Sequence, residues 1–146
     1  DLYGRLGVIY RDGRNFETAI VALKCVVDGC TPQESCDARN GCAVGDPGNI
    51  VQSLPLSAGT ADYYLIYGSL LASFSPQKPS NCDEAVRVLT LLVQTYSTNQ
   101  NTVRNAADGL SICASVIAAQ TLTPTPVTIP ASTVITTSTQ VYTPRP

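Results

Sequence analysis

Six cysteines constrain this chain more than any other feature of its sequence. Four of them lie between positions 25 and 42, and the chain contains no histidine. Zinc sites need ligand sets such as paired Cys-x2-Cys motifs, which these spacings do not supply, so disulfides are favoured over a metal. Because disulfides persist in oxidising compartments, the sequence predicts a secreted or cell-surface protein. We expect all six cysteines to be bonded: Cys25, Cys30, Cys36, Cys42, Cys82 and Cys113.

Composition excludes several classes of function. The 146 residues carry nine Lys and Arg against eleven Asp and Glu, and the basic residues are scattered, which argues against nucleic-acid binding. Without histidine a His-dependent catalytic triad is impossible, and the adjacent Asp83 and Glu84 would point apart on a helix. No apolar run reaches membrane-spanning length. We therefore expect no enzyme, no cofactor, no metal, no nucleic-acid partner and no transmembrane segment.

The chain divides into two regions of different composition. Residues 1–120 hold nearly all the charge and the helical periodicity, and they predict one all-α domain. Residues 121–146 contain nine Thr, five Pro and a single charge, Arg145. Because proline removes a backbone donor and fixes φ, we expect this tail to be extended rather than helical.

Apolar residues repeat every three or four positions in five segments of the first region. We expect Asn81 to be the N-cap of the fourth helix, with Glu84 in the capping-box position. The five predicted helices span about 2–12, 16–29, 60 or 61–74, 82–96 and 101–119.

The spacing within the first two helix pairs is the most specific pattern. In the first pair, the pattern is Tyr3-x2-Leu6-Gly7-x2-Tyr10 followed by Ala19-x3-Leu23. In the second pair, it is Tyr64-x2-Tyr67-Gly68-x2-Leu71 followed by Ala85-x3-Leu89. This pattern resembles that of tetratricopeptide-repeat (TPR) proteins. The resemblance implies a short stack of antiparallel helix hairpins with a groove along the first helix of each pair. The tyrosines on those helices either line that groove or pack in the core: Tyr3, Tyr10, Tyr64 and Tyr67.

One large insertion departs from the repeat pattern. Residues 30–59 replace a tight turn and contain four Gly, three Pro and three Cys. A loop of this length in a compact domain needs to be pinned, and disulfides would pin it. We favour a Cys82–Cys113 bond between the last two helices, with the four earlier cysteines paired among themselves; other pairings stay open.

The tail has the alternation of a half-buried strand. Apolar side chains occupy one parity and Thr or Ser the other, although Val134 and Tyr142 break the pattern. Extended, the tail is longer than its own domain is wide, so we expect it to dock on a neighbouring copy. A head-to-tail contact of this kind propagates as a filament when it does not close a ring. The predicted docking residues are Val127, Ile129, Ala131, Ile135 and Val141.

These features lead to two hypotheses for function. The first is an extracellular structural protein that assembles into a filament of identical copies and carries O-linked glycans on its tail. The alternative is a secreted TPR-like adaptor whose groove binds a peptide or protein, with the tail as a glycosylated stalk. The candidate glycan sites are Thr121, Thr123, Thr125, Thr128, Thr133, Thr136, Thr137 and Thr139.

Overall fold

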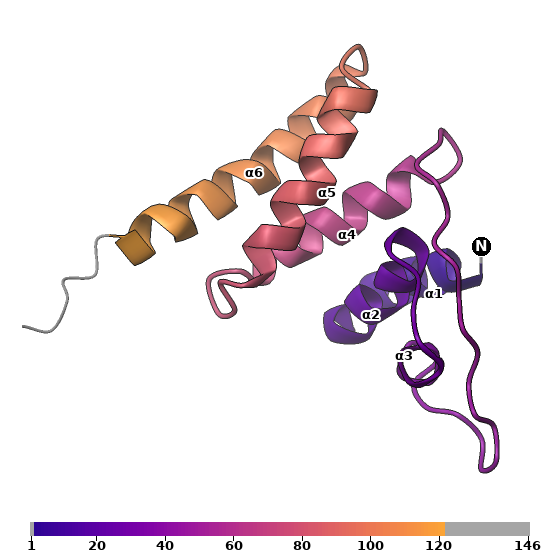
Figure 1. Ribbon diagram of the computed structural model, residues 1–146. Helices are drawn as coiled ribbons and strands as arrows, with labels where there is room; N and C mark the ends of the chain where they lie inside the picture. The colour runs from indigo at the N-terminus through magenta and orange to yellow at the C-terminus, as the bar shows by residue number, and fades with distance from the viewer. Residues whose placement is uncertain (1, 122–146) are drawn as a thin grey trace, which may run out of the picture.

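A computed structural model describes residues 2–121, and its regular elements are six α-helices and one isolated β-bridge (Figure 1). The described part of the chain is therefore an all-α domain, as the sequence predicts. The predicted docking residues and most predicted glycan sites lie outside the described range: Val127, Ile129, Ala131, Ile135, Val141, Thr123, Thr125, Thr128, Thr133, Thr136, Thr137 and Thr139.

Two helix hairpins and one further helix make up the body. The first hairpin joins α1 to α2, the second joins α4 to α5, and α6 packs against both helices of the second. α2 and, to a smaller extent, α1 pack against α4 and so connect the hairpins, while α1 does not pack against α6. These are the five predicted helices: α1 (Leu2–Asp12), α2 (Phe16–Val27), α4 (Ala61–Phe74), α5 (Asn81–Thr95) and α6 (Gln100–Thr121).

The start of α5 corrects one prediction. Asn81 is already the first helical residue, and Ser80 precedes it without a side-chain capping bond. Glu84 pairs with Arg87 one turn further on instead of closing a capping box. The backbone shows the reason, because the amides of Asn81 and Cys82 bond to the Lys78 and Pro79 carbonyls at 2.9 and 3.0 Å. The chain therefore turns before Asn81 and places this residue inside the helix instead of at its cap.

A sixth helix, α3 (Pro32–Asp37), lies inside the insertion, where the sequence analysis placed only a pinned loop. Thr31 is its N-cap, and it forms a capping box with Glu34. The Glu34 carboxylate accepts from the Thr31 amide at 2.9 Å, and proline stands in the first turn, where no amide is needed. Local capping therefore starts a helix that is too short to show apolar periodicity.

The main core fills the space between α2, α4, α5 and α6. Leu89 of α5 is fully buried between two glycines of the neighbouring helices. A Cβ added at Gly68 or at Gly109 would lie 2.6 Å from the Leu89 side chain. The glycines let three helices approach around one leucine, and Gly7 receives Leu23 of α2 in the same way in the first hairpin.

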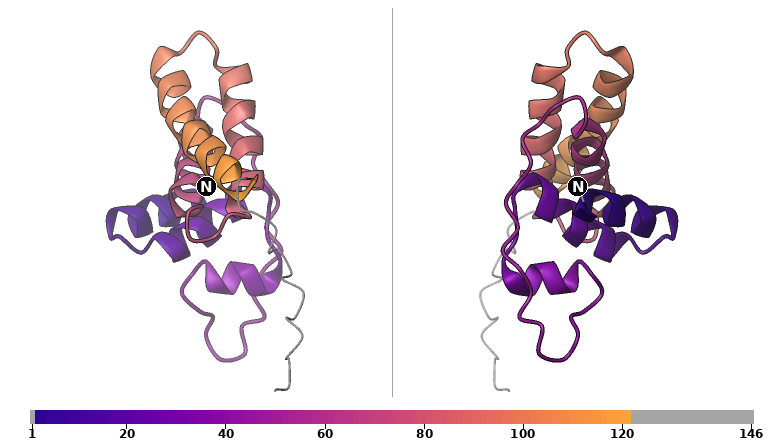
Figure 2. Two further views of the ribbon diagram at one scale, coloured as in Figure 1. Left: turned by 90° about the vertical axis from the view of Figure 1, so that its left-hand side faces the viewer. Right: turned by 90° about the vertical axis from the view of Figure 1, so that its right-hand side faces the viewer.

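A smaller core lies beneath the insertion, around Cys25 and Cys30, with Tyr3 packed on it. The returning chain is fixed by backbone bonds, of which Cys30 and Val51 exchange two at 2.9 Å. Gly29 has a φ of +79°, and its close approach to the Val51 carbonyl leaves no room for a side chain. Figures 1 and 2 place α3 and the loop after it at the opposite end of the body from the turn between α5 and α6.

Candidate functional site

The structure pairs all six cysteines and confirms the favoured pairing. Cys82–Cys113 joins α5 to α6 across 31 residues of sequence, and both side chains are buried in the main core. The four earlier cysteines pair locally, over five and six residues. These two bonds are Cys25–Cys30 and Cys36–Cys42. The fold therefore has one long-range cross-link and two short ones in and beside the insertion.

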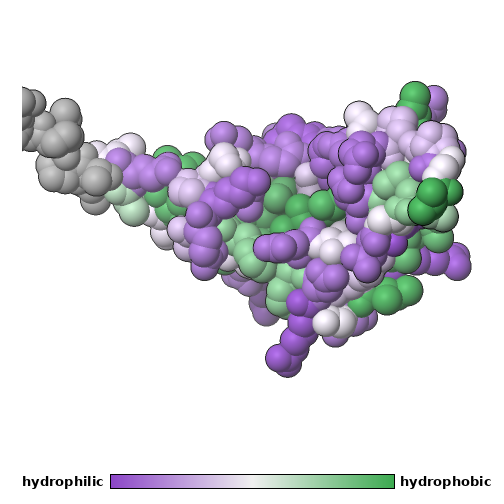
Figure 3. Space-filling view, turned by 90° about the horizontal axis from the view of Figure 1, so that it is seen from below, coloured by the Kyte–Doolittle hydropathy of each residue, from purple (hydrophilic) through white to green (hydrophobic). Residues whose placement is uncertain are grey.

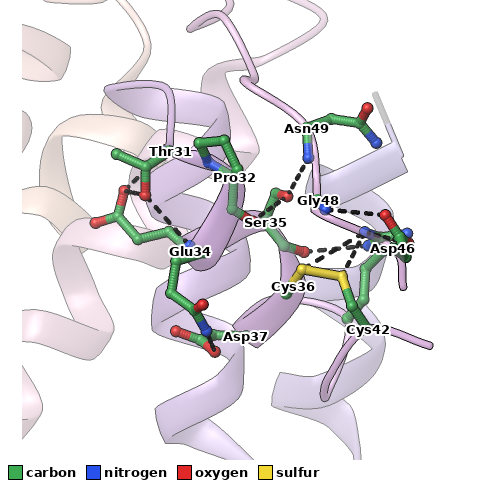
Figure 4. Close-up of a disulfide and its surroundings, with 12 residues drawn as sticks. Thr31, Pro32, Glu34, Ser35, Cys36, Asp37, Cys42, Asp46, Gly48 and Asn49 are labelled. Carbon is green, nitrogen blue, oxygen red and sulfur yellow. Dashed lines mark hydrogen bonds and ion pairs between the residues drawn. A yellow bond between two sulfur atoms is a disulfide. The ribbon is translucent and has the colours of Figure 1, made fainter. Parts of the chain in front are cut away.

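The Cys36–Cys42 disulfide closes the loop after α3 (Figure 4). The Arg39 guanidinium lies beside it, with Nη2 2.9 Å from the Cys42 sulfur and 3.2 Å from an Asp46 carboxylate oxygen. Its Nε donates to the Ser35 carbonyl at 3.2 Å. The charges of Arg39 and Asp46 pair with each other in holding the loop, so the role of this cluster is structural.

The four groove tyrosines do not gather around a ligand site. Tyr64 and Tyr67 are buried in the main core, at 5% and 3% exposure. The Tyr64 hydroxyl donates to the Leu54 carbonyl at 2.7 Å, which ties the insertion to α4. Burial raises the pKa of the Tyr67 hydroxyl. Tyr3 and Tyr10 are half-buried against the smaller core. The packing alternative is therefore the one that the structure supports for Tyr64 and Tyr67.

A charged cluster fastens α2, α3 and α5 together. Lys24 of α2 pairs with Glu34 of α3, and Arg87 of α5 pairs with Asp28 and Glu84. The bond to Lys24, together with the Thr31 amide, lowers the pKa of Glu34 to about 2. Burial and the neighbouring Glu84 carboxyl raise the pKa of Asp28, whereas Arg87 lowers the pKa of Glu84. These charged groups pair with one another, which is typical of ion pairs that connect neighbouring helices.

A groove is lined by residues of α4 and α6, together with Arg11 of α1. It has a volume of about 410 Å³. Its apolar side chains are Leu65, Ile66, Leu70 and Ile112. Its polar side chains are Ser69, Ser73, Asn105, Asp108 and Arg11. We call this surface the α4–α6 groove. One of its helices, α4, is the first helix of the second predicted pair, but the groove residues of α4 lie on the face opposite to Tyr64 and Tyr67.

Exposed large apolar side chains are concentrated on the outer helices. Leu2 and Ile9 of α1 are exposed, as are Leu91 of α5 and Ile112 and Ile117 of α6. The other two in the described range belong to the insertion, Val44 and Ile50. Seen from below, strongly hydrophobic residues lie at the surface on the side of the body away from the C-terminal end of α6 (Figure 3).

Residues 2–121 offer no group of three or more Cys, Asp or Glu side chains that could hold a metal ion. None of the helices described is both long enough and apolar enough to span a bilayer. Thr121, the one predicted glycan site within the described range, is exposed at the end of α6, where its hydroxyl donates to the Ala118 carbonyl at 2.8 Å.

The sequence pattern did not predict the α4–α6 groove, because the predicted groove was assigned to the helix faces that carry the tyrosines. One signal could have indicated the surface, since α4 carries no charge between Asp62 and Lys78. A helix of this kind has apolar side chains on two faces. Its hairpin partner covers one of these faces, and the second face must contact a further helix or a ligand.

Comparisons with protein-family models, with curated proteins and with solved structures find no match to this chain. A proposal for its function therefore rests on its own residues and surfaces.

Proposed function

We propose that this chain is an extracellular structural protein, a short tetratricopeptide-like stack that assembles with copies of itself into a filament. Residues 121–146 of one copy dock on a neighbour, and O-linked glycans are carried by the threonines of that segment. The observation that carries the proposal is the location of exposed apolar side chains. In the described helices, the large apolar side chains that are exposed belong to α1, α5 and α6, and none belongs to α2, α3 or α4.

We infer that these exposed side chains form two faces, because Ile9 and Ile117 belong to α1 and α6, which both pack against α4 and not against each other. Burying a Leu or Ile side chain contributes about 1.5–3 kcal/mol, which favours covering each face. If one face covers the other on the next copy, the contact is heterologous, and it extends as a filament when the rotation between copies does not close a ring.

The three disulfides support an extracellular location, because such bonds persist where the environment is oxidising. Low charge supports the glycan part of the proposal. Charged residues make up only 14% of the chain, and sugars on the threonine-rich segment would keep an assembled surface hydrated.

A mixing experiment tests the heterologous assembly. Ile9→Lys removes one face and Ile117→Lys the other, and each variant alone should stay monomeric by sedimentation velocity. Mixed in equal amounts, the two should form a one-to-one dimer and no longer species, because each copy keeps one working face. Val44→Lys, at an exposed insertion residue, is the control and should assemble as the parent chain does. Filaments from either single variant would contradict the proposal.

The second candidate, a secreted adaptor that binds a peptide, is favoured by the α4–α6 groove. An adaptor on a stalk has no need to associate with itself. A sedimentation measurement on the full chain from low to high micromolar concentration separates the two, because only the structural protein should gain mass with concentration.

A further inference from the structure

We propose that the α4–α6 groove is the surface that accepts the C-terminal segment of a second copy, through residues 127–135. This inference deepens the proposed function and rests on it, because it names the acceptor for the docking that assembly requires. It assigns the groove to an uncharged, extended segment of a sister chain rather than to a foreign ligand.

The chemistry of the groove matches that segment. Its apolar side chains are Leu65, Ile66 and Leu70 of α4 and Ile112 of α6. Its polar side chains include Ser69, Ser73, Asn105 and Asp108, and helical spacing places the two serines between the apolar positions of α4. An extended peptide whose side chains alternate between apolar and hydroxyl has partners of both kinds on such a mixed surface. The sequence of residues 127–135 is VTIPASTVI, with that alternation over most of its length.

Charge points to the same occupant. The α4 side of the groove comes from a stretch that has no charged residue between positions 62 and 78. The segment 122–144 is likewise uncharged, and Arg145 is the one charged residue after it. The charged side chains that line the groove are Asp108 and Arg11, and Arg11 pairs with Asp12. A peptide rich in acidic or basic residues would therefore lose hydration on the apolar side chains and find few partners in return.

The position of the segment's start favours a second copy over the chain's own body. α6 ends at Thr121, nine residues beyond Ile112, which is about 14 Å along a helix at 1.5 Å per residue. Figure 1 shows this end of α6 projecting from the body. The first residues after it include Pro124, Pro126 and Pro130, which disfavour the reversal needed to return along α6. A neighbour's groove needs no reversal.

A photo-cross-linking experiment on the full chain tests the acceptor. p-Benzoylphenylalanine replaces Ser73, which is exposed and lines the groove. The same replacement at Ser80, an exposed serine in the turn before α5 with no side-chain capping bond, is the matched control. Copies labelled with ¹⁵N are mixed with unlabelled copies before irradiation, so that peptide mass spectrometry identifies cross-links between copies.

We expect position 73, and not position 80, to cross-link to residues 122–146 of the other isotope. In a parallel measurement Ser73→Arg should weaken self-association at least tenfold, while Ser80→Arg should change it less than twofold. Cross-links only within one copy would overturn the inference. Assembly without any cross-link from position 73 to residues 122–146 would also overturn it, yet would leave the proposed filament standing. A full chain that never assembles would overturn both.

Discussion

The region from α4 to α6 and the insertion at residues 30–59 are held in contrasting ways. The helical region has a large apolar core, and its leucine and glycine contacts set how closely the helices approach. The insertion contributes few side chains to that core and is fastened by short-range disulfides, a β-bridge and ion pairs. Packing determines the first region, and cross-links determine the second. The two should therefore respond differently to changes of the same size.

Removing disulfides should give the largest difference. Cys82→Ser with Cys113→Ser opens a cross-link over 31 residues of sequence, and loop entropy alone predicts a loss of about 3–4 kcal/mol in the free energy of unfolding. Cys36→Ser with Cys42→Ser opens a cross-link over six residues and should cost about 2 kcal/mol. Chemical denaturation of both variants without reductant measures the difference. Equal losses would show that the short bond supports more than its own loop.

Adding a methyl group to the packed region should come next. Gly109→Ala would place a Cβ against Leu89, and overpacking of this kind costs about 1–3 kcal/mol. Gly59→Ala, at the end of the insertion, meets no atom closer than 4.0 Å and should be neutral or slightly stabilising. Thermal melts of the two variants check the expectation. A neutral Gly109→Ala would mean that the helices can move apart without cost.

The smallest effect belongs to the ion pair between Lys24 and Glu34. Because the pKa of Glu34 is lowered to about 2, the ionised carboxylate stabilises the fold at pH values above its unfolded pKa of about 4.5. That contribution is lost as the pH falls from about 4.5 towards 2. Both side chains are partly exposed, so Glu34→Gln should cost less than about 1 kcal/mol at neutral pH. Melting temperatures across this pH range should converge for the variant and the parent; a constant gap would contradict the pairing.

The sequence predicted the helical region well because periodic apolar positions determine both where helices form and which faces they bury. The predicted helices agree with the structure to within about two residues at each end. The pairing of Cys82 with Cys113 followed from the same helix positions, because it joins two adjacent helices at buried sites.

The insertion and the groove were harder to predict for physical reasons. α3 begins at one capping box and has too few residues for apolar periodicity to show. Thr31, Pro32 and Glu34 are nevertheless the sequence pattern of a helix N-terminus. The groove depends on which face of α4 its neighbours leave uncovered. That choice is made by packing between helices far apart in sequence, so the tyrosine pattern indicated the wrong face.

Sedimentation velocity tests self-assembly most directly, on the full chain beside a chain that ends at Thr121. The shorter chain keeps both cores and all three disulfides. We expect the full chain to form species that lengthen with micromolar concentration and the shorter chain to stay monomeric with an unchanged circular dichroism spectrum. Equal assembly of both chains, or none by the full chain, would contradict the account.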